Sequence, residues 1–107
     1  MKYHNKKTEC LGIIFDSKKE SVRYQELLIL EKGGEIKNLE RQVKFQIVPK
    51  NKDERAAFYV ADFVYENKKG DKIIEDVKSA MTRKLPLYIL KRKLVKYLYS
   101  EYLFIET

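Results

Sequence analysis

Two acidic residues interrupt apolar stretches in the second half of the chain. Asp62 lies within the apolar run 58–65 and Asp76 within the run 73–77, and Lys78 follows Asp76 two positions later. Aspartate is uncommon in β-strands, and a buried carboxylate is costly unless a cation or hydrogen bonds balance its charge. Such acids suit metal-dependent cleavage of phosphodiester bonds, because carboxylate oxygens hold Mg²⁺ or Mn²⁺, which makes a water more acidic and polarises the phosphate. Lys78 would orient that water or offset negative charge in the transition state.

The two acids meet only if the two stretches pair as an antiparallel hairpin. Residues 57–65 and 72–78 are rich in β-branched and aromatic side chains, which predicts a strand for each. If residues 67–71 form a five-residue loop, Asp62 lies opposite Asp76 with the two Cβ atoms about 4.5–5.5 Å apart. Two like charges at that distance repel each other, so the arrangement favours a cation between them.

The register of this hairpin is open at this point. In the five-residue loop, Glu66 pairs with Lys72. A four-residue loop would instead place Glu75 opposite Asp62 and turn Asp76 to the other face of the sheet. A purely structural alternative is that Asp76 and the lysine two residues later form an ordinary ion pair at a strand end.

The surrounding elements predict one domain over residues 1–107, of mixed α/β class. Ser17, with Glu20 three residues later, forms a capping box at the start of a helix that ends at Gly33-Gly34. Pro86 suits the first turn of a second helix, which runs to about Tyr99. The remaining predictions are extended segments at 11–15, 36–39, 43–48 and 102–105, a loop at 79–83 and a basic N-terminal arm at 1–10.

The second helix carries leucines at helical spacing, and this stripe is predicted to face the core. The stripe consists of Leu87, Leu90, Leu94 and Leu98. Three tyrosines near the end of the helix are expected to pack in the core rather than to stack on bases. They are Tyr97, Tyr99 and Tyr102.

The excess of positive charge is concentrated in one segment. The 107 residues include 23 Lys and Arg against 16 Asp and Glu, which gives a net charge of +7. Residues 77–100 hold seven of the basic residues and no acidic one, so the rest of the chain is balanced. This concentration favours a polyanionic partner, with nucleic acid first, although a solvated basic helix is the alternative. Six of these cations are candidate nucleic-acid contacts: Arg83, Lys84, Lys91, Arg92, Lys93 and Lys96.

Composition argues against several other classes of protein. The chain has no apolar run of about 18 residues, which argues against a transmembrane helix, and no apolar stretch behind its N-terminal residues, which argues against a secretory signal. A single cysteine, Cys10, and a single histidine, His4, exclude a disulfide framework and an ordinary structural zinc site. We expect a cytoplasmic protein with no membrane partner and no small-molecule cofactor.

Ala61-Asp62 followed by Asp76-Val77-Lys78 resembles the signature of the PD-(D/E)XK nuclease superfamily. The wider sequence is similar to an uncharacterised family of small phage and prophage proteins in that superfamily, and to phage Holliday-junction endonucleases in size and motif order. The segments that carry this resemblance are Asn5-Lys6-Lys7-Thr8, Phe15-Asp16-Ser17-Lys18-Lys19-Glu20, Tyr24, Gln42-Val43-Lys44-Phe45, Ala61-Asp62-Phe63 and Glu75-Asp76-Val77-Lys78. Ala61 stands where the signature has proline, and Ser79 where a glycine often follows the lysine.

The resemblance implies a restriction-endonuclease-like core of helix, three antiparallel strands, helix and strand. It also implies that Glu20, from the first helix, joins Asp62 and Asp76 in holding the metal, although a capping role alone explains Glu20 equally well. Gln42 lies near the site in the family pattern, but it also suits a polar strand edge. Glu75, beside Asp76, leaves the assignment of the second acid open.

We therefore expect a Mg²⁺-dependent DNA endonuclease, with Mn²⁺ able to substitute, that acts on branched or junction DNA in phage replication or recombination. The resemblance points to a bacterial host cell, and cutting two strands favours a homodimer. The catalytic candidates are Glu20, Asp62, Asp76 and Lys78. Two alternatives remain: a catalytically silent DNA-binding accessory protein on the same fold, and a subunit that acts only with a partner protein.

Overall fold

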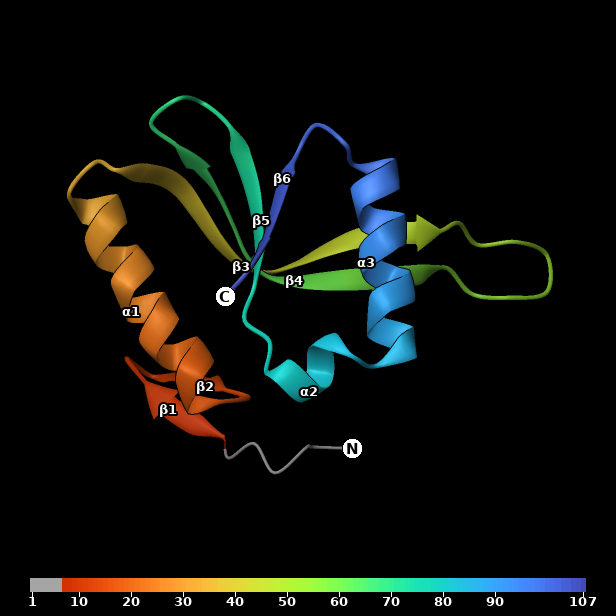
Figure 1. The fold of residues 1–107 in the computed structure, drawn as a ribbon, viewed down its shortest axis with the longest axis horizontal. Coiled ribbons are helices and arrows are strands. Elements are labelled where there is room, and N and C mark those ends of the chain that lie inside the picture. The colour runs from red at the N-terminus through yellow and green to blue at the C-terminus, as the bar shows by residue number, and fades with distance from the viewer. Residues whose placement is uncertain (1–6) are drawn as a thin grey trace.

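A four-stranded mixed sheet lies between two helices in the computed structural model, which describes residues 7–107 (Figure 1). The strands follow the order β3 (Ile36–Val48), β4 (Ala57–Asn67), β5 (Lys72–Asp76) and β6 (Leu103–Glu106). Neighbours are antiparallel from β3 to β5, while β6 runs parallel to β5. The predicted mixed α/β class is confirmed.

Helix α1 (Lys18–Lys32) begins and ends where the sequence predicts. The hydroxyl of Ser17 accepts a hydrogen bond from the backbone N–H of Glu20 at 3.1 Å, which confirms the predicted N-cap. Gly33 donates its N–H to the carbonyl of Ile29. Gly34 has a φ of +80°, the left-handed region in which glycine carries no Cβ penalty.

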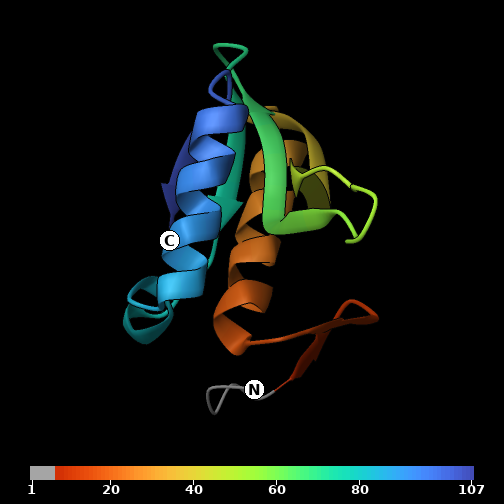
Figure 2. The same cartoon turned by 90° about the vertical axis from the view of Figure 1, so that its right-hand side faces the viewer.

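The core consists of two apolar clusters on opposite faces of the sheet. Val64 and Ile74 belong to the cluster that packs against the C-terminal helix, whereas Tyr65 and Ile73, one residue along each strand, belong to the cluster that packs against α1. Because side chains alternate along a strand, these neighbours point to opposite faces. The two helices therefore cover one face each (Figures 1 and 2).

Strand β3 is one long strand rather than the two predicted segments. It continues through residues 38–42, with positive φ values of 58° at Asn38 and 52° at Gln42. Its pairing with β4 shifts register between Lys37 and Glu40. These irregularities interrupt the alternation of apolar and polar residues, which is why the sequence pattern split the strand.

Two short elements replace predicted irregular segments. Strand β1 (Thr8–Cys10) pairs with β2 (Ile13–Phe15), so the last part of the predicted N-terminal arm is a strand, and residues 1–6 of that arm lie outside the described residues. Helix α2 (Ala80–Arg83) occupies the predicted loop, because Ser79 caps it by accepting a hydrogen bond from the N–H of Thr82.

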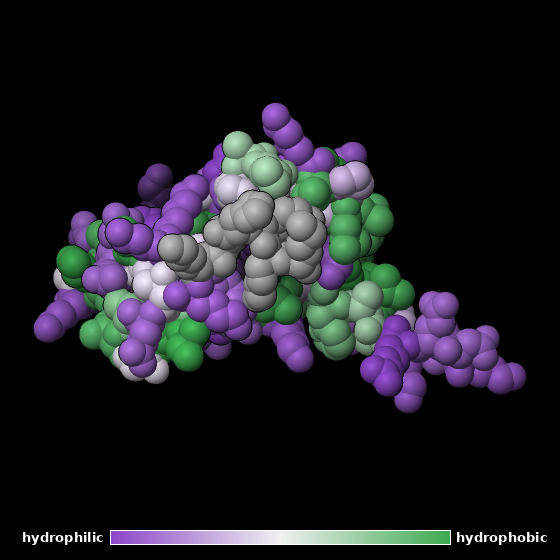
Figure 3. Space-filling view, turned by 90° about the horizontal axis from the view of Figure 1, so that it is seen from below, coloured by the Kyte–Doolittle hydropathy of each residue, from purple (hydrophilic) through white to green (hydrophobic). Residues whose placement is uncertain are grey.

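Helix α3 (Pro86–Leu98) has the predicted bounds, but the predicted buried face is wrong. Leu87 and Leu90 are 65% and 56% exposed, and Tyr88 and Val95 are buried instead. Leu98 and Tyr97 are also exposed, against expectation, whereas Leu94, Tyr99 and Tyr102 pack against the core as predicted. Figure 3 shows apolar residues gathered at the right of the molecule, the side of α3 in Figure 1. Among residues 7–107, no helix combines the length and the apolar composition needed to cross a bilayer.

Candidate functional site

The β4–β5 hairpin has the five-residue-loop register. Glu66 pairs with Lys72, and Phe63 stands opposite Glu75. The side chain of Asn67 holds the turn, since its Oδ1 accepts hydrogen bonds from the backbone N–H groups of Lys69 and Asp71. This register excludes the four-residue alternative and brings Asp62 and Asp76 together at the end of the hairpin.

Asp62 and Asp76 are linked through the backbone at the point where the two strands separate. The N–H of Asp62 donates to Asp76 Oδ1 at 3.0 Å, and the N–H of Val77 donates to Asp62 Oδ2 at 2.8 Å. Asp62 is 7% exposed and Asp76 is fully buried. One oxygen of each carboxylate therefore accepts a hydrogen bond from a backbone amide, and the other oxygen can bind a different partner.

Lys78 lies beside these acids. Its ammonium nitrogen is 3.9 Å from Asp62 Oδ2 and 5.6 Å from the centre of the Tyr88 ring. The backbone N–H of Lys78 donates to the carbonyl of Thr107, and its own carbonyl accepts from the ammonium group of Lys19. The main chain of Lys78 is thus held from two sides, by the end of the chain and by α1.

Glu20 reaches the same region from α1. Its carboxylate is buried and accepts a hydrogen bond from the amide of Gln42 at 3.1 Å, while the guanidinium of Arg41 lies 3.9 Å away. The backbone N–H of Glu20 binds the Ser17 cap, while its carboxylate turns toward β3 and accepts from Gln42. Gln42 has a positive φ and belongs to the irregular part of β3. This part directs the side chains of Arg41 and Gln42 toward Glu20.

Sequence reasoning missed Arg41. Its guanidinium carbon sits 4.4 Å from the centre of the Phe15 ring, a cation–π contact that orients the group toward Glu20. The only signal for it in the sequence is the break in strand alternation between Leu39 and Val43, which marks residues that do not follow the pleat.

Burial disfavours the charged form of all three carboxyl groups. Burial first and the charge of Asp62 second raise the pKa of Glu20 to about 7, while Arg41 acts in the opposite direction. Burial also raises the pKa of Asp76 to about 6, against the influence of Lys78. The pKa of Asp62 is raised by burial as well, although Lys78 and the amide of Val77 oppose the shift.

These residues fit a hard divalent cation by their chemistry. Among residues 7–107, no three His, Cys, Asp or Glu side chains stand close enough to form a ready metal-binding group. Yet Asp76 Oδ2 is buried with no hydrogen-bond partner in the described part of the chain. Mg²⁺ and Mn²⁺ prefer oxygen ligands, which all three residues supply. A bound ion would also give the unpaired oxygen of Asp76 a partner and offset the cost of the buried negative charges. Glu20, Asp62 and Asp76 are the side chains that could hold such an ion.

Glu75 belongs to the opposite face of the sheet. It accepts hydrogen bonds from Arg23 at 2.5 and 3.1 Å, from the hydroxyl of Tyr65 at 2.6 Å and from the hydroxyl of Thr107 at 3.0 Å. A buried acid with four donors has a structural role. Asp76, not Glu75, is therefore the acid that accompanies Lys78.

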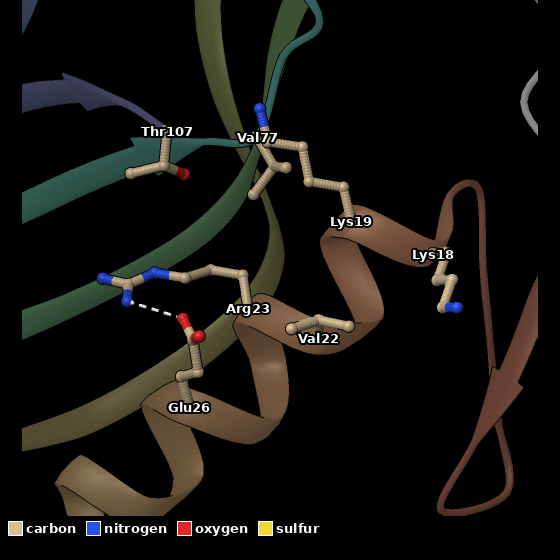
Figure 4. A pocket seen from close by; sticks show the side chains of 7 residues that line it. All are labelled: Lys18, Lys19, Val22, Arg23, Glu26, Val77 and Thr107. Carbon is tan, nitrogen blue, oxygen red and sulfur yellow. Dashed lines mark hydrogen bonds and ion pairs between the residues drawn. The ribbon is translucent and has the colours of Figure 1, made fainter.

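A cavity of about 540 Å³ lies between α1 and the ends of β5 and β6 (Figure 4). Lys18, Lys19 and Arg23 line it, and Arg23 also pairs with Glu26 at 3.1 Å. Val77 and Thr107 form its wall on the side of the sheet. None of the three candidate metal-binding carboxylates lines this cavity, so it is separate from them.

The basic residues that were predicted to contact nucleic acid differ in solvent exposure. Lys84, Lys93 and Lys96 are exposed, and Lys91 is partly exposed. Arg92 is engaged within the protein, because its guanidinium lies 3.4 Å from the carboxylate of Glu106 and 5.7 Å from the Tyr88 ring centre. Arg83 is partly buried, and its Nε has no hydrogen-bond partner in the described part of the chain.

One family matches the chain. It is described as "Protein of unknown function (DUF1064)", and the match covers residues 1–105, which include Glu20, the hairpin with both aspartates and the whole of α3. No curated protein and no solved structure matches the chain.

Proposed function

The chain belongs to the DUF1064 family, and we propose that it is a metal-dependent DNA endonuclease with a restriction-endonuclease-like core. One observation carries the proposal. The β4–β5 register brings Asp62 and Asp76 together with Lys78, at a position that Glu20 reaches from α1. This arrangement supports the resemblance to PD-(D/E)XK nucleases, whose signature residues include Asp62, Asp76 and Lys78.

Each of the four side chains has a role in the proposed reaction. Asp62, Asp76 and Glu20 hold Mg²⁺, or Mn²⁺ in its place, with the oxygens that the backbone amides leave available. Such an ion supplies Lewis-acid stabilisation of the phosphate charge and a more acidic water. Lys78 places its positive charge beside the phosphate, orients the attacking water and offsets negative charge in the transition state. The water oxygen bonds to phosphorus as the water releases a proton to solvent, and the bond from phosphorus to the leaving sugar oxygen breaks, with that oxygen taking up a proton from solvent.

The substrate we propose is DNA, branched DNA in particular, in phage replication or recombination. The basic surplus supports a polyanion, because it starts beside Lys78 and continues along α3 with no acidic residue up to position 100. Lysine contacts to phosphates position the backbone but carry no sequence information. Selectivity for branched DNA follows from the resemblance to Holliday-junction endonucleases.

A homodimer is part of this proposal, because a single site cuts one strand and two related sites cut both. The exposed apolar side chains of α3, such as Leu90 and Leu98, offer a surface for self-association. Light scattering of the purified protein checks the molecular mass, and a monomer at the concentration of the cleavage assay removes this part of the proposal.

A DNA-binding protein without cleavage is the second candidate. It is favoured by the backbone hydrogen bonds of Asp62 and Asp76, which give both acids a structural role. A subunit that requires a partner protein is a variant of this candidate.

Cleavage assays separate the candidates. Labelled duplex, single-stranded and four-way-junction DNA is incubated with the protein and Mg²⁺, Mn²⁺ or EDTA. The endonuclease proposal predicts cleavage with either metal and none with EDTA. Binding of DNA without cleavage of any substrate would support the silent accessory protein instead.

A further inference from the structure

A groove of about 560 Å³ lies between β4 and the α2–α3 segment. Its walls are mostly apolar, and Lys78 and Lys91 are the charged residues among those that line it. On β4 the groove is lined by residues 58–60. This part of β4 is not paired with β5, because β5 pairs only with residues 63–66 of β4. Since Lys78 also contacts Asp62, the groove opens directly beside the candidate catalytic residues.

Phe58 provides an aromatic surface in this groove. Its side chain is 38% exposed, and the ammonium nitrogen of Lys44 lies 5.7 Å from its ring centre. Val60, two residues along β4, and Leu87, from α3, are exposed apolar neighbours in the same groove. An exposed ring flanked by cations is the arrangement on which proteins stack the bases of single-stranded nucleic acid.

The lining of the groove also includes polar residues. Tyr59 lines the groove, and its hydroxyl is buried with no hydrogen-bond partner among residues 7–107. Lys78, Thr82 and Lys91 add polar groups to this lining. A nucleobase combines an apolar face for stacking with polar edges, whereas an aliphatic side chain of a partner protein offers only the first.

We propose that this groove binds one unpaired nucleobase of DNA, next to the phosphate that Lys78 contacts. The inference rests on the proposed function, and it specifies the substrate as DNA with an unpaired or unstacked nucleotide beside the cleaved bond. A fully paired duplex keeps its bases stacked inside the helix, so it leaves the groove empty. Lys44, Lys78 and Lys91 neutralise the phosphates on either side of the bound nucleotide.

The test measures binding in EDTA, so that no cleavage interferes. Anisotropy compares a perfectly paired duplex with the same duplex carrying one bulged 2-aminopurine, whose fluorescence reports stacking. The wild-type protein is expected to bind the bulged DNA about tenfold more tightly than the paired DNA, with quenching of the probe. Phe58→Ala is expected to remove both the preference and the quenching, while Phe58→Tyr, which keeps the ring, retains them.

Tyr97→Ala is the matched control, because Tyr97 is an aromatic residue of α3 that is 80% exposed and does not line the groove. This variant is expected to keep the preference. Thermal unfolding of Phe58→Ala confirms that the fold is intact, and Phe58→Leu provides a second variant of apolar character without a ring.

Equal affinity of the wild-type protein for both DNAs would overturn the inference, as would a preference that survives Phe58→Ala. A change of oligomeric state in Phe58→Ala with an unchanged base preference would identify the groove as a protein interface and would equally overturn it. Because binding is measured without metal, these outcomes leave the proposed cleavage untouched. Conversely, absence of metal-dependent cleavage on every DNA overturns the proposed function even where the base preference holds.

Discussion

Asp62 donates its backbone N–H to the carboxylate of Asp76, at 3.0 Å, across the open end of the β4–β5 hairpin. The second oxygen of Asp76 is buried and has no hydrogen-bond partner among the described residues. One oxygen of Asp76 thus holds the two strands of the hairpin together by a hydrogen bond, while its other oxygen is the one offered to the candidate site. Substitutions of Asp76 can separate these two roles.

Asp76→Asn keeps an oxygen that accepts the N–H of Asp62 but removes the buried charge. We expect it to fold and, at about pH 8 without metal, to be at least as stable as the wild-type protein. Asp76→Ala leaves the N–H of Asp62 without its acceptor and is expected to lower the free energy of unfolding by about 1–3 kcal/mol. Urea unfolding of both variants measures the difference. Asp53→Asn, an acid in the exposed β3–β4 connection, is the control and should change stability by less than about 0.5 kcal/mol.

The same variants test metal binding without an activity assay. Mn²⁺ is expected to raise the melting temperature of the wild-type protein and of Asp53→Asn, since a ligand of the folded state stabilises it. Asp76→Asn is expected to lose this increase, because an amide replaces a charged metal ligand. A full Mn²⁺ response in Asp76→Asn would remove Asp76 from the metal site.

The stability of the metal-free protein should fall as the pH rises. The pKa of Glu20 is raised from 4.5 to about 7 and that of Asp76 from 3.8 to about 6, both chiefly by burial. The folded protein therefore holds these protons more tightly than the unfolded chain does. This contribution to stability is complete below the unfolded pKa values and is lost as the pH rises through about 6 and 7.

Unfolding in urea at a series of pH values between about 4.5 and 8 measures this dependence. Glu20→Gln removes one of the titrating groups and is expected to flatten the curve near neutral pH. Glu26→Gln, an exposed residue of the same helix, should leave the slope unchanged. A stability that increases over this range would show that the carboxylates are better balanced by cations than the structure indicates.

Glu75 and Asp76 are neighbours with different expected effects. Glu75→Gln removes the charge that pairs with Arg23 at 2.5 Å, and we expect it to lower the free energy of unfolding by about 1–3 kcal/mol, because the carboxylate is buried while Arg23 is partly exposed to water. Its Mn²⁺ response should persist. Chemical unfolding with and without Mn²⁺ checks both statements, and loss of the Mn²⁺ response at unchanged stability would reverse the assignment of the two acids.

The start of α1 could be predicted from the sequence, and the register of the β4–β5 hairpin could be limited to two alternatives, because the determinants of both are local. Ser17 and Glu20 specify the start of α1 through one side chain and one backbone group. The turn closed by Asn67 and Asp71 specifies the pairing of Glu66 with Lys72, and the position of Asp62 beside Asp76 follows from it. Asp62 and Asp76 indicated a site for the same reason, since the free-energy cost of a carboxylate in an apolar strand can be judged from the strand's own sequence.

The buried face of α3 could not be predicted from the sequence, because it depends on what the helix packs against. Leu87 and Leu90 lie on one apolar stripe, and Tyr88 and Val95 on another. Both stripes satisfy helical periodicity, and only contacts with β3 and β4 select between them. The role of Arg41 depends likewise on an irregular part of β3 that no local pattern specifies.

The exposed lysines of the α2–α3 region should dominate the salt dependence of DNA binding. Replacing both Lys91 and Lys93 by Gln is expected to weaken binding and to reduce the slope of log affinity against log salt by about 1 for each phosphate that is no longer neutralised. Arg92→Gln should change the slope less, because Arg92 already pairs with Glu106. Lys69→Gln, in the β4–β5 turn, is the control. Titrations at several salt concentrations measure the slope, and an unchanged slope in the double variant would exclude these lysines from the interface.

Cleavage of a labelled four-way junction by the wild-type protein and by Asp76→Asn, side by side, decides whether the acids of the β4–β5 hairpin form a nuclease site. We predict cleavage by the wild-type protein in Mg²⁺ and in Mn²⁺, none in EDTA, and a loss of activity to background in Asp76→Asn despite intact folding. Lys78→Met is expected to reduce the rate by about a hundredfold or more, as removal of one charge-stabilising group does. Cleavage by Asp76→Asn at the wild-type rate would show that Asp76 has no part in the reaction and that the site lies elsewhere.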